Sequence, residues 1–214
     1  MAERRRPPPL DITIKHEFKM YNPNSQPELK QIPDLVFLTD ILPNLAIGTI
    51  EQAHNIELLQ KHGITHVLNI TRTPCPDSYL DTTNGGSNSI KSLQIPIADT
   101  LDTVNGNLIK HFPEVFKFID YTLENNGKIL IHCQAGISRS PAFIIGYLMW
   151  NYKGKGNPEK NYTLDTYMTM IRKYRPEIGP NLNFCGQLLM FHNAITNSID
   201  YNLDSICADV LQKM

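Results

Sequence analysis

The sequence predicts an α/β fold in which a central, mostly parallel, twisted sheet is flanked by helices. Short apolar runs bounded by Gly, Pro and Asn alternate with longer helical patterns along most of the 214 residues. This alternation is typical of parallel strands joined by helical crossovers. The run 128–131 is followed after one tight loop by the long apolar segment 141–150. A functional loop at the carboxyl end of a strand is characteristic of such sheets.

The individual elements follow from the spacing of their apolar residues. Short runs rich in Val, Ile and Leu predict strands at 36–38, 45–47, 66–70, 92–97 and 128–131. Apolar residues at helical spacing predict helices at 50–62, 108–125, 141–152, 163–174 and 182–196. The turn-rich stretch 73–90 predicts an exposed loop beside the functional site.

Three regions are expected along the chain. Residues 1–33 are polar and punctuated by proline, which predicts an extended N-terminal arm. Residues 34–198 form the domain with the strand and helix pattern. Residues 199–214 predict an amphipathic helix that caps the domain, in preference to binding a partner, and its apolar face comprises Ile199, Leu203, Ile206, Val210 and Met214.

Composition argues against several classes of partner. The formal net charge of −1 gives no support for nucleic acid. No apolar run approaches the roughly 20 residues that span a bilayer, and the Arg-rich start lacks the apolar region of a secretory signal, so no membrane partner is expected. The four cysteines have no framework spacing, which favours a reducing compartment, cytoplasmic and/or nuclear. His62 and His66 have a helical metal spacing, but Gly63 between them indicates a helix end, so no metal or other cofactor is expected.

The most specific chemistry lies in His132-Cys133-Gln134-Ala135-Gly136-Ile137-Ser138-Arg139-Ser140. A cysteine there ends a strand, and the loop after it enters a helix N-terminus. Free backbone N–H groups and the positive end of a helix dipole favour an anion and a thiolate at that place. We expect the phosphoryl group of a substrate to be bound by the inward-pointing amides of Gln134, Ala135, Gly136, Ile137 and Ser138, and by the guanidinium of Arg139.

Each remaining residue of this stretch has an expected role. Gly136 is predicted to adopt a backbone angle that a side chain would forbid. Ser140 places a hydroxyl beside the sulfur, where it hydrogen-bonds the thiolate or serves only as a helix cap. His132 is expected to orient the loop through backbone hydrogen bonds.

The implied reaction is a phosphoryl transfer in two steps. Cys133 attacks phosphorus to give a cysteinyl-phosphate, and water then hydrolyses it. The oxygen of the leaving group needs a proton, so a carboxylic acid must face the loop. Asp99 and Asp102 both lie in a suitable segment, a strand end followed by a surface loop.

The chain resembles the dual-specificity phosphatases of the cysteine-based protein tyrosine phosphatase superfamily over about residues 34–195. The resemblance rests on five blocks in order, namely 42–48, 63–69, the segment around Asp99, 132–140 and 175–181. It implies a phosphoprotein substrate bound in a shallow pocket, Asp99 in preference to Asp102 as the acid, and Asn181 as a brace of the phosphate-binding loop. Two departures from the family pattern, Ala46-Ile47 and a longer 153–161 stretch, lie away from this chemistry.

Alternatives remain at this level. Phosphoinositide and RNA 5′-phosphate phosphatases use the same cysteine loop, although the neutral residues 134–138 argue against such highly charged substrates. A phosphopeptide-binding module without turnover is a rival of another class. Residues 4–12 resemble the docking motif by which peptides bind mitogen-activated protein kinases; their sequence is Arg4-Arg5-Arg6-Pro7-Pro8-Pro9-Leu10-Asp11-Ile12. The alternative interpretation of this segment is a basic tail without a docking role. The oligomeric state is not indicated by any of these features.

Overall fold

The five strands of the sheet run in the order β1-β2-β5-β3-β4 in a computed structural model that describes residues 38–79, 89–153, 162–198 and 202–214. The strands are β1 (Thr39–Leu42), β2 (Leu45–Gly48), β3 (His66–Asn69), β4 (Lys91–Gln94) and β5 (Ile129–His132). β2, β5, β3 and β4 are parallel, and β1 pairs antiparallel with β2. The prediction of a mostly parallel α/β sheet is confirmed.

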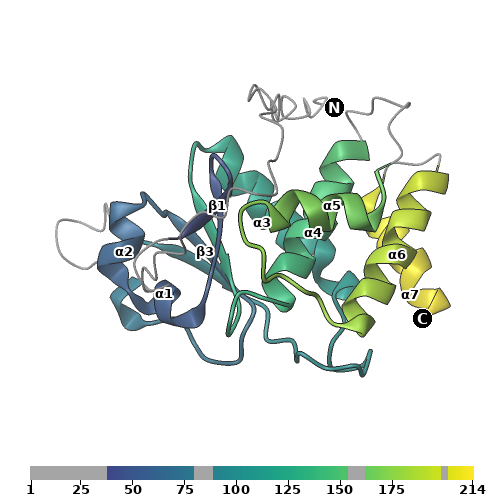
Figure 1. Cartoon of the computed structure of the whole chain (residues 1–214), viewed down its shortest axis with the longest axis horizontal. Coiled ribbons are helices and arrows are strands. Elements are labelled where there is room, and N and C mark those ends of the chain that lie inside the picture. Colours follow the sequence, from purple (N-terminus) through teal and green to yellow (C-terminus); the bar gives the residue numbers. More distant parts are fainter. Residues whose placement is uncertain (1–37, 80–88, 154–161, 199–201) are drawn as a thin grey trace, which may run out of the picture.

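Helices cover both faces of this sheet, as Figure 1 shows, with α1 and α2 on one side and α3 to α6 on the other. The helices are α1 (Ile50–His54), α2 (Ile56–Lys61), α3 (Phe112–Glu124), α4 (Arg139–Lys153), α5 (Leu164–Arg172), α6 (Leu182–Asn197) and α7 (Leu203–Lys213). In the part of the chain that the structure describes, the 3₁₀ turns η1 (Asp77–Tyr79) and η3 (Ile109–His111) interrupt the loops. Within the described ranges, no helix is long and apolar enough to cross a bilayer.

The core consists of two apolar layers separated by the sheet. All four residues of β5 are buried, and their side chains alternate between the layers because successive residues of a strand face opposite sides. Ile129 and Ile131 join the larger cluster under α3 to α6, and Leu130 joins the smaller one under α1 and α2. Burial of each such side chain contributes roughly 1.5–3 kcal/mol. The strand that carries the functional loop is therefore fixed from both faces of the sheet.

The single helix expected at 50–62 is wrong, because Asn55 divides it. The backbone of Asn55 is extended, with φ −90° and ψ 93°, and its side-chain oxygen accepts a hydrogen bond from Leu58 N at 3.0 Å. Asparagine competes in this way for backbone groups that a continuous helix would use. Ile50, the first residue of α1, contacts the functional loop, because its backbone N donates to Gln134 O at 3.2 Å.

Other boundaries differ in smaller ways. The first strand begins at Thr39 after Leu38, whereas Val36 and Phe37, also expected in a strand, lie outside the described residues. The segment 73–90 is not a wholly exposed loop where it is described, because Tyr79 is buried and its hydroxyl donates to Ala53 O at 2.7 Å. The helix expected from residue 108 begins as the η3 turn and becomes α-helical at Phe112.

The C-terminal helix packs onto the body of the protein. Ile206 and Val210 of α7 are buried in the larger core cluster, beside α6, α3 and η3. Met214, expected on the same face, is 41% exposed, and Ile199 lies outside the described residues, as does the arm 1–33. The buried face supports the cap that the sequence predicts, and the division of the chain at residues 33 and 198 stays a prediction.

Candidate active site

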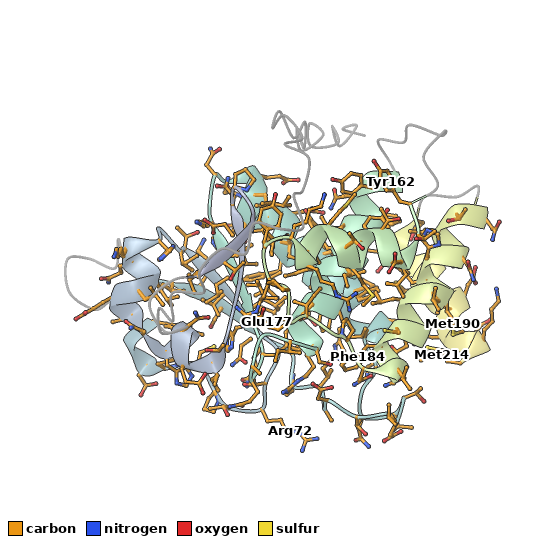
Figure 2. All side chains as sticks on the ribbon, in the orientation of Figure 1. Arg72, Tyr162, Glu177, Phe184, Met190 and Met214 are labelled. Carbon is orange, nitrogen blue, oxygen red and sulfur yellow. The ribbon has the colours of Figure 1, made fainter. Side chains whose placement is uncertain are left out.

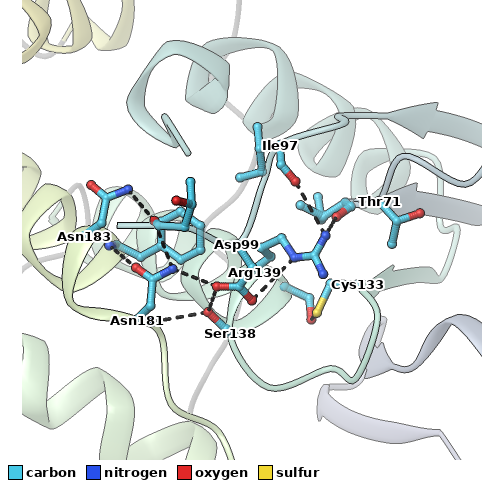
Figure 3. Close-up of polar contacts among 12 residues, drawn as sticks. Thr71, Ile97, Asp99, Cys133, Ser138, Arg139, Asn181 and Asn183 are labelled. Carbon is cyan, nitrogen blue, oxygen red and sulfur yellow. Dashed lines mark hydrogen bonds and ion pairs between the residues drawn. The ribbon is translucent and has the colours of Figure 1, made fainter. Parts of the chain in front are cut away.

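The residues that the sequence predicts as functional meet at the carboxyl end of β5, in residues 133–139, whose last member, Arg139, is the first residue of α4 (Figure 3). Cys133 is 2% exposed and lies at the base of this 133–139 loop. Ser140, in the first turn of α4, donates a hydrogen bond from its Oγ to Cys133 Sγ at 3.3 Å. Because α4 already begins at Arg139, Ser140 is not the helix cap, and its hydroxyl serves the sulfur.

Arg175 holds two carbonyl groups of the loop from outside. Its Nη2 donates to Ala135 O and its Nε donates to Gly136 O, both at 3.1 Å. Arg175 is 8% exposed, and its guanidinium is also paired with Glu177 at 3.3 Å. The carbonyls of Ala135 and Gly136 are thereby turned away from the interior of the loop.

Two backbone amides hold the neighbouring carbonyls in the same way. Ile50 N, at the start of α1, donates to Gln134 O at 3.2 Å, and Gly179 N donates to Ile137 O at 2.8 Å. In a planar trans peptide the carbonyl and the following N–H point in opposite directions. Four outward carbonyls, from 134 to 137, therefore turn the amides of residues 135 to 138 inward. An inward ring of N–H groups is an anion-binding site.

Gly136 provides the one left-handed backbone position of the loop, with φ +68°. A Cβ at this residue would lie 2.8 Å from Gly48 O and 3.0 Å from Arg175 Nη2. A side chain is therefore excluded both by backbone strain and by space. This confirms the backbone angle predicted for Gly136.

The surroundings of Cys133 favour its thiolate. Burial is the largest single influence and would raise the pKa of the thiol. The hydroxyl of Ser140, the amides of Ser140 and Gly136 and the charge of Arg139 act in the opposite direction, and together they hold the pKa below its ordinary value. The ionised sulfur is the nucleophilic form.

The guanidinium of Arg139 lies between the 133–139 loop and the carboxylate of Asp99 (Figure 3). Its Nη1 donates to Ile70 O at 3.1 Å and to Ile97 O at 3.5 Å, which fixes the plane of the group at the ends of two strands. Among the described residues, its buried Nε has no hydrogen-bond partner. Asp99 Oδ2 lies 3.6 Å from that nitrogen, which is an ion pair but not a hydrogen bond. The Nε–H of Arg139 therefore faces the carboxylate of Asp99 and makes no hydrogen bond within the described residues.

Asp99 lies over the loop, whereas Asp102 does not. The Oδ1 atom of Asp99 accepts hydrogen bonds from Ser138 Oγ at 2.9 Å and from Asn181 Nδ2 at 2.7 Å (Figure 3). The carboxylate of Asp102 points instead toward residues 104 and 105, where it accepts hydrogen bonds from Val104 N at 2.8 Å and from the Asn105 amide. These hydrogen bonds lower the pKa of Asp102. Of the two candidate acids, the structure brings only Asp99 to the cysteine loop.

Asn181 joins the two loops at the start of α6. Its Oδ1 caps α6 by accepting from Phe184 N at 2.9 Å, and its backbone N donates to Ser138 Oγ at 3.3 Å. Its Nδ2 donates to Asp99. Phe184, labelled in Figure 2, is fully buried and anchors this end of the helix. Asn181 thus contacts both the 133–139 loop and Asp99.

His132 is neutral at pH 7. Burial of the imidazole is the main reason that its pKa is lowered to about 4. Its Nδ1 lies 3.4 Å from Cys133 O and donates to that carbonyl in the tautomer protonated at Nδ1. The residue can therefore orient the loop through the backbone, but it supplies no positive charge to the thiolate.

Three side chains at the site were not predicted from the sequence, namely Arg175, Asn183 and Gln187. Arg175 belongs to the 175–181 block, but nothing in the sequence indicates that it reaches carbonyls about 40 residues away. Asn183 and Gln187 bind the segment 98–108, which we call the 98–108 loop. The available signal was the polar residue Gln187 on the otherwise apolar face of α6, because a buried amide needs hydrogen-bond partners.

The surroundings offer little for a metal. Among residues 38–79, 89–153, 162–198 and 202–214 there is no group of three His, Cys, Asp or Glu side chains placed to hold an ion. His66 is buried against Phe118 and Tyr121, with its Nδ1 2.8 Å from Thr65 Oγ1. Arg72, on the loop after β3, extends away from the body of the molecule in Figure 2 and is exposed.

Comparison with known proteins places this loop in a family. The model of the dual specificity phosphatase catalytic domain matches residues 46–194, well over half of the sequence. The chain belongs to the dual specificity phosphatase family. Dual specificity protein phosphatase 19 of Mus musculus is 34% identical over 148 residues, which are 69% of this chain and 59% of that protein. The chain therefore spans about three fifths of the length of this relative.

Solved structures agree with the family. The Yvh1 phosphatase domain of Chaetomium thermophilum is 29% identical with a TM-score of 0.62, and the match covers 76% of this chain and 99% of that one. A human protein described as a tyrosine phosphatase-like serine/threonine/tyrosine-interacting protein is also 29% identical, with a TM-score of 0.59 and the same coverage. The α/β fold is thus shared with members whose names describe both phosphatases and phosphatase-like proteins.

Proposed function

We propose that this protein is a phosphoprotein phosphatase that hydrolyses phosphotyrosine and phosphoserine or phosphothreonine through a cysteinyl-phosphate. Membership in the dual specificity phosphatase family supports protein phosphatase activity. The observation that carries the mechanism is the position of Cys133 Sγ at the base of a loop of inward amides, with Ser140 Oγ 3.3 Å away and the paired side chains of Arg139 and Asp99 at the same loop.

In the first step the thiolate of Cys133 attacks phosphorus, and an S–P bond forms as the bond between phosphorus and the substrate oxygen breaks. The amides of the loop and the guanidinium of Arg139 stabilise the charge on the equatorial oxygens. Asp99 gives its proton to the departing oxygen, so that the dephosphorylated side chain leaves as an alcohol or phenol.

In the second step water attacks phosphorus and the S–P bond breaks. Asp99, now a carboxylate, takes the proton from the water. The electron pair of the broken bond returns to Cys133 Sγ, where the hydroxyl of Ser140 donates to the re-formed thiolate. Inorganic phosphate then leaves, and no metal or cofactor enters either step.

The central test compares the wild-type protein with Cys133→Ser. The reduced wild type is expected to hydrolyse a small aryl phosphate, and Cys133→Ser is expected to bind but not turn over substrate, because a hydroxyl does not ionise at neutral pH. The trapped phosphoprotein, identified from the Cys133→Ser complex, gives the physiological substrate. Unchanged turnover by Cys133→Ser would contradict the proposal.

The state of the thiol is tested separately by its alkylation rate against pH. The half-point should lie below that of free cysteine, about 8.5. Ser140→Ala removes a donor to the sulfur and should move the half-point upward, because the thiolate loses a stabilising hydrogen bond. A wild-type thiol that titrates like free cysteine would rule out this mechanism.

Two other functions compete with this one. The side chains of residues 134–138 carry no charge, which favours a phosphoprotein over phosphoinositides or RNA 5′-phosphates. Greater activity on those substrates than on phosphopeptides would reverse the order. A binding module without turnover is favoured by the likeness to the human interacting protein. The coincidence of Cys133, Arg139 and Asp99 argues for turnover.

We also propose that the basic and apolar segment 4–12, outside the described residues, docks to a mitogen-activated protein kinase. The basic cluster would meet an acidic patch of the kinase, and alternating apolar residues would fill grooves. Kinase binding that survives replacement of Arg4, Arg5 and Arg6 by alanine would exclude this role.

The four free cysteines support a location in the cytoplasm and/or nucleus.

A further inference from the structure

We propose that Asn183 and Gln187, in the first two turns of α6, are positioning residues that hold the 98–108 loop, and with it Asp99, at the place required for proton transfer to the leaving group. The inference rests on the proposed function, because these residues act through its acid. Their amide groups bind the loop backbone, and Asp99 lies near one end of it.

Asn183 joins both ends of the 98–108 loop. Its Nδ2 lies 3.0 Å from Thr100 O, 2.9 Å from Gly106 O and 3.4 Å from Asp102 O. One nitrogen with two hydrogens therefore serves three carbonyl groups that converge on it. Since Thr100 directly follows Asp99, this nitrogen fixes the backbone next to the acid.

Gln187 secures the other end and also orients Asn183. It is 2% exposed, and its Nε2 donates to Gly106 O at 2.7 Å and to Asn183 Oδ1 at 2.8 Å. Its Oε1 accepts from Leu108 N at 2.7 Å. Both N–H groups and the oxygen of the Gln187 amide are therefore hydrogen-bonded. Their partners belong either to the 98–108 loop or to Asn183, which also holds that loop.

Packing alone does not require a polar residue at this place. Phe184 and Leu188, neighbours of Gln187 on the buried face of α6, are fully buried apolar residues. A buried amide is tolerated only when it is hydrogen-bonded, whereas a leucine would fill the space without that condition. The amide instead supplies partners to a loop that must keep a carboxyl group within hydrogen-bond reach of the reacting oxygen. A displacement of about 1 Å at such a group can cost 10²-fold in rate.

Gly106 gives a second way to disturb the contact, from the side of the loop. A Cβ there would lie 3.0 Å from Asn183 Nδ2 and 3.1 Å from the carbonyl oxygens of Ala98 and Asp102. These distances are tighter than ordinary van der Waals contact, so Gly106→Ala should push the loop away from α6. This variant leaves both amide side chains in place.

The experiment measures kcat/KM for a series of aryl phosphates that differ in the acidity of the leaving phenol. An acidic phenol departs without a proton, and a weakly acidic one needs the acid. Asn183→Ala, Gln187→Glu and Gly106→Ala should change the best substrates by no more than about twofold and lower the poorest by roughly tenfold or more. Asn193→Ala, an exposed amide about three turns further along α6, is the matched control and should follow the wild type throughout.

A combined variant separates positioning from stability. In an Asp99→Asn background the acid is already lost, so adding Asn183→Ala should lower kcat/KM no further. A loss that is equal for every leaving group, no loss at all, or an additive effect in the combined variant would overturn the inference. If Asn183→Ala does not fold, Gly106→Ala carries the same comparison.

Different results would contradict the phosphatase function and the positioning role of Asn183 and Gln187. A reduced wild-type protein that hydrolyses no aryl phosphate contradicts the phosphatase function and the positioning role together. A wild type whose turnover of poor leaving groups depends on Asp99, with Asn183→Ala and Gly106→Ala unchanged, contradicts the positioning role alone.

Discussion

Replacement of Arg175 by lysine is expected to weaken phosphate binding although Arg175 lies outside the 133–139 loop. The guanidinium donates to Ala135 O and Gly136 O at once, which requires two parallel N–H groups. Lysine carries the same charge as a single point and cannot reproduce this fork. One of the two carbonyls should therefore lose its donor, and the amide that follows it should lose its inward direction.

The size of the effect follows from the hydrogen bonds involved. A hydrogen bond to a charged group contributes about 1.5–3 kcal/mol. The loss of one of them from Arg175 should lower the free energy of unfolding by about that amount, or the melting temperature by roughly 3–12 °C for a domain of this size. An inward amide that no longer binds the phosphate should raise the inhibition constant of inorganic phosphate by roughly 10- to 100-fold.

The assay combines thermal unfolding with competitive inhibition by inorganic phosphate below the melting temperature of the variant. Arg172→Lys is the matched control, because Arg172 donates to Ile178 O at 3.2 Å in the same segment of chain. It should leave the phosphate inhibition constant unchanged. A folded Arg175→Lys protein that binds phosphate as tightly as the wild type would refute the argument that outward carbonyls set the direction of the amides.

Three further results are expected. Asp99→Asn should lower turnover by roughly 10²–10⁴-fold, with the largest loss for poor leaving groups, whereas Asp102→Asn should leave turnover unchanged. The reverse outcome would identify Asp102 as the acid. The pKa of His132 is about 4 in the folded protein and near 6.5 in the unfolded chain, so only the unfolded chain is protonated between these pH values. The free energy of unfolding, measured by denaturant titration, should therefore fall by up to roughly 3 kcal/mol as the pH is lowered from 6.5 to 4. The decrease should be smaller in His132→Asn. Deletion of residues 199–214 removes buried side chains of α7 and should lower the melting temperature by several degrees, and an unchanged value would contradict the cap.

Local patterns in the sequence predicted the strand, loop and helix around Cys133 well. The apolar run 128–131, observed as the strand Ile129–His132, and the apolar segment after Ser140 leave few alternatives, because strands and helices differ in the period of their apolar residues. The positive φ of Gly136 and the place of Ser140 beside the sulfur followed from the same stretch. Where a side chain competed locally with the backbone, at Asn55, the helix pattern gave the wrong result.

The sequence by itself determined that a cysteine ends a buried strand in front of a helix N-terminus, because both facts depend on neighbours within a few residues. Local patterns left Asp99 and Asp102 both open, and only the family resemblance favoured Asp99. The tertiary structure shows that Asp99 contacts the cysteine loop, and it alone shows which side chains direct the peptide groups of that loop. The pairs concerned, such as Asp99 with Asn181 or Arg175 with Gly136, are 82 and 39 residues apart in the chain. Hydrogen bonds over such separations depend on how the strands and helices pack, and no local periodicity records them.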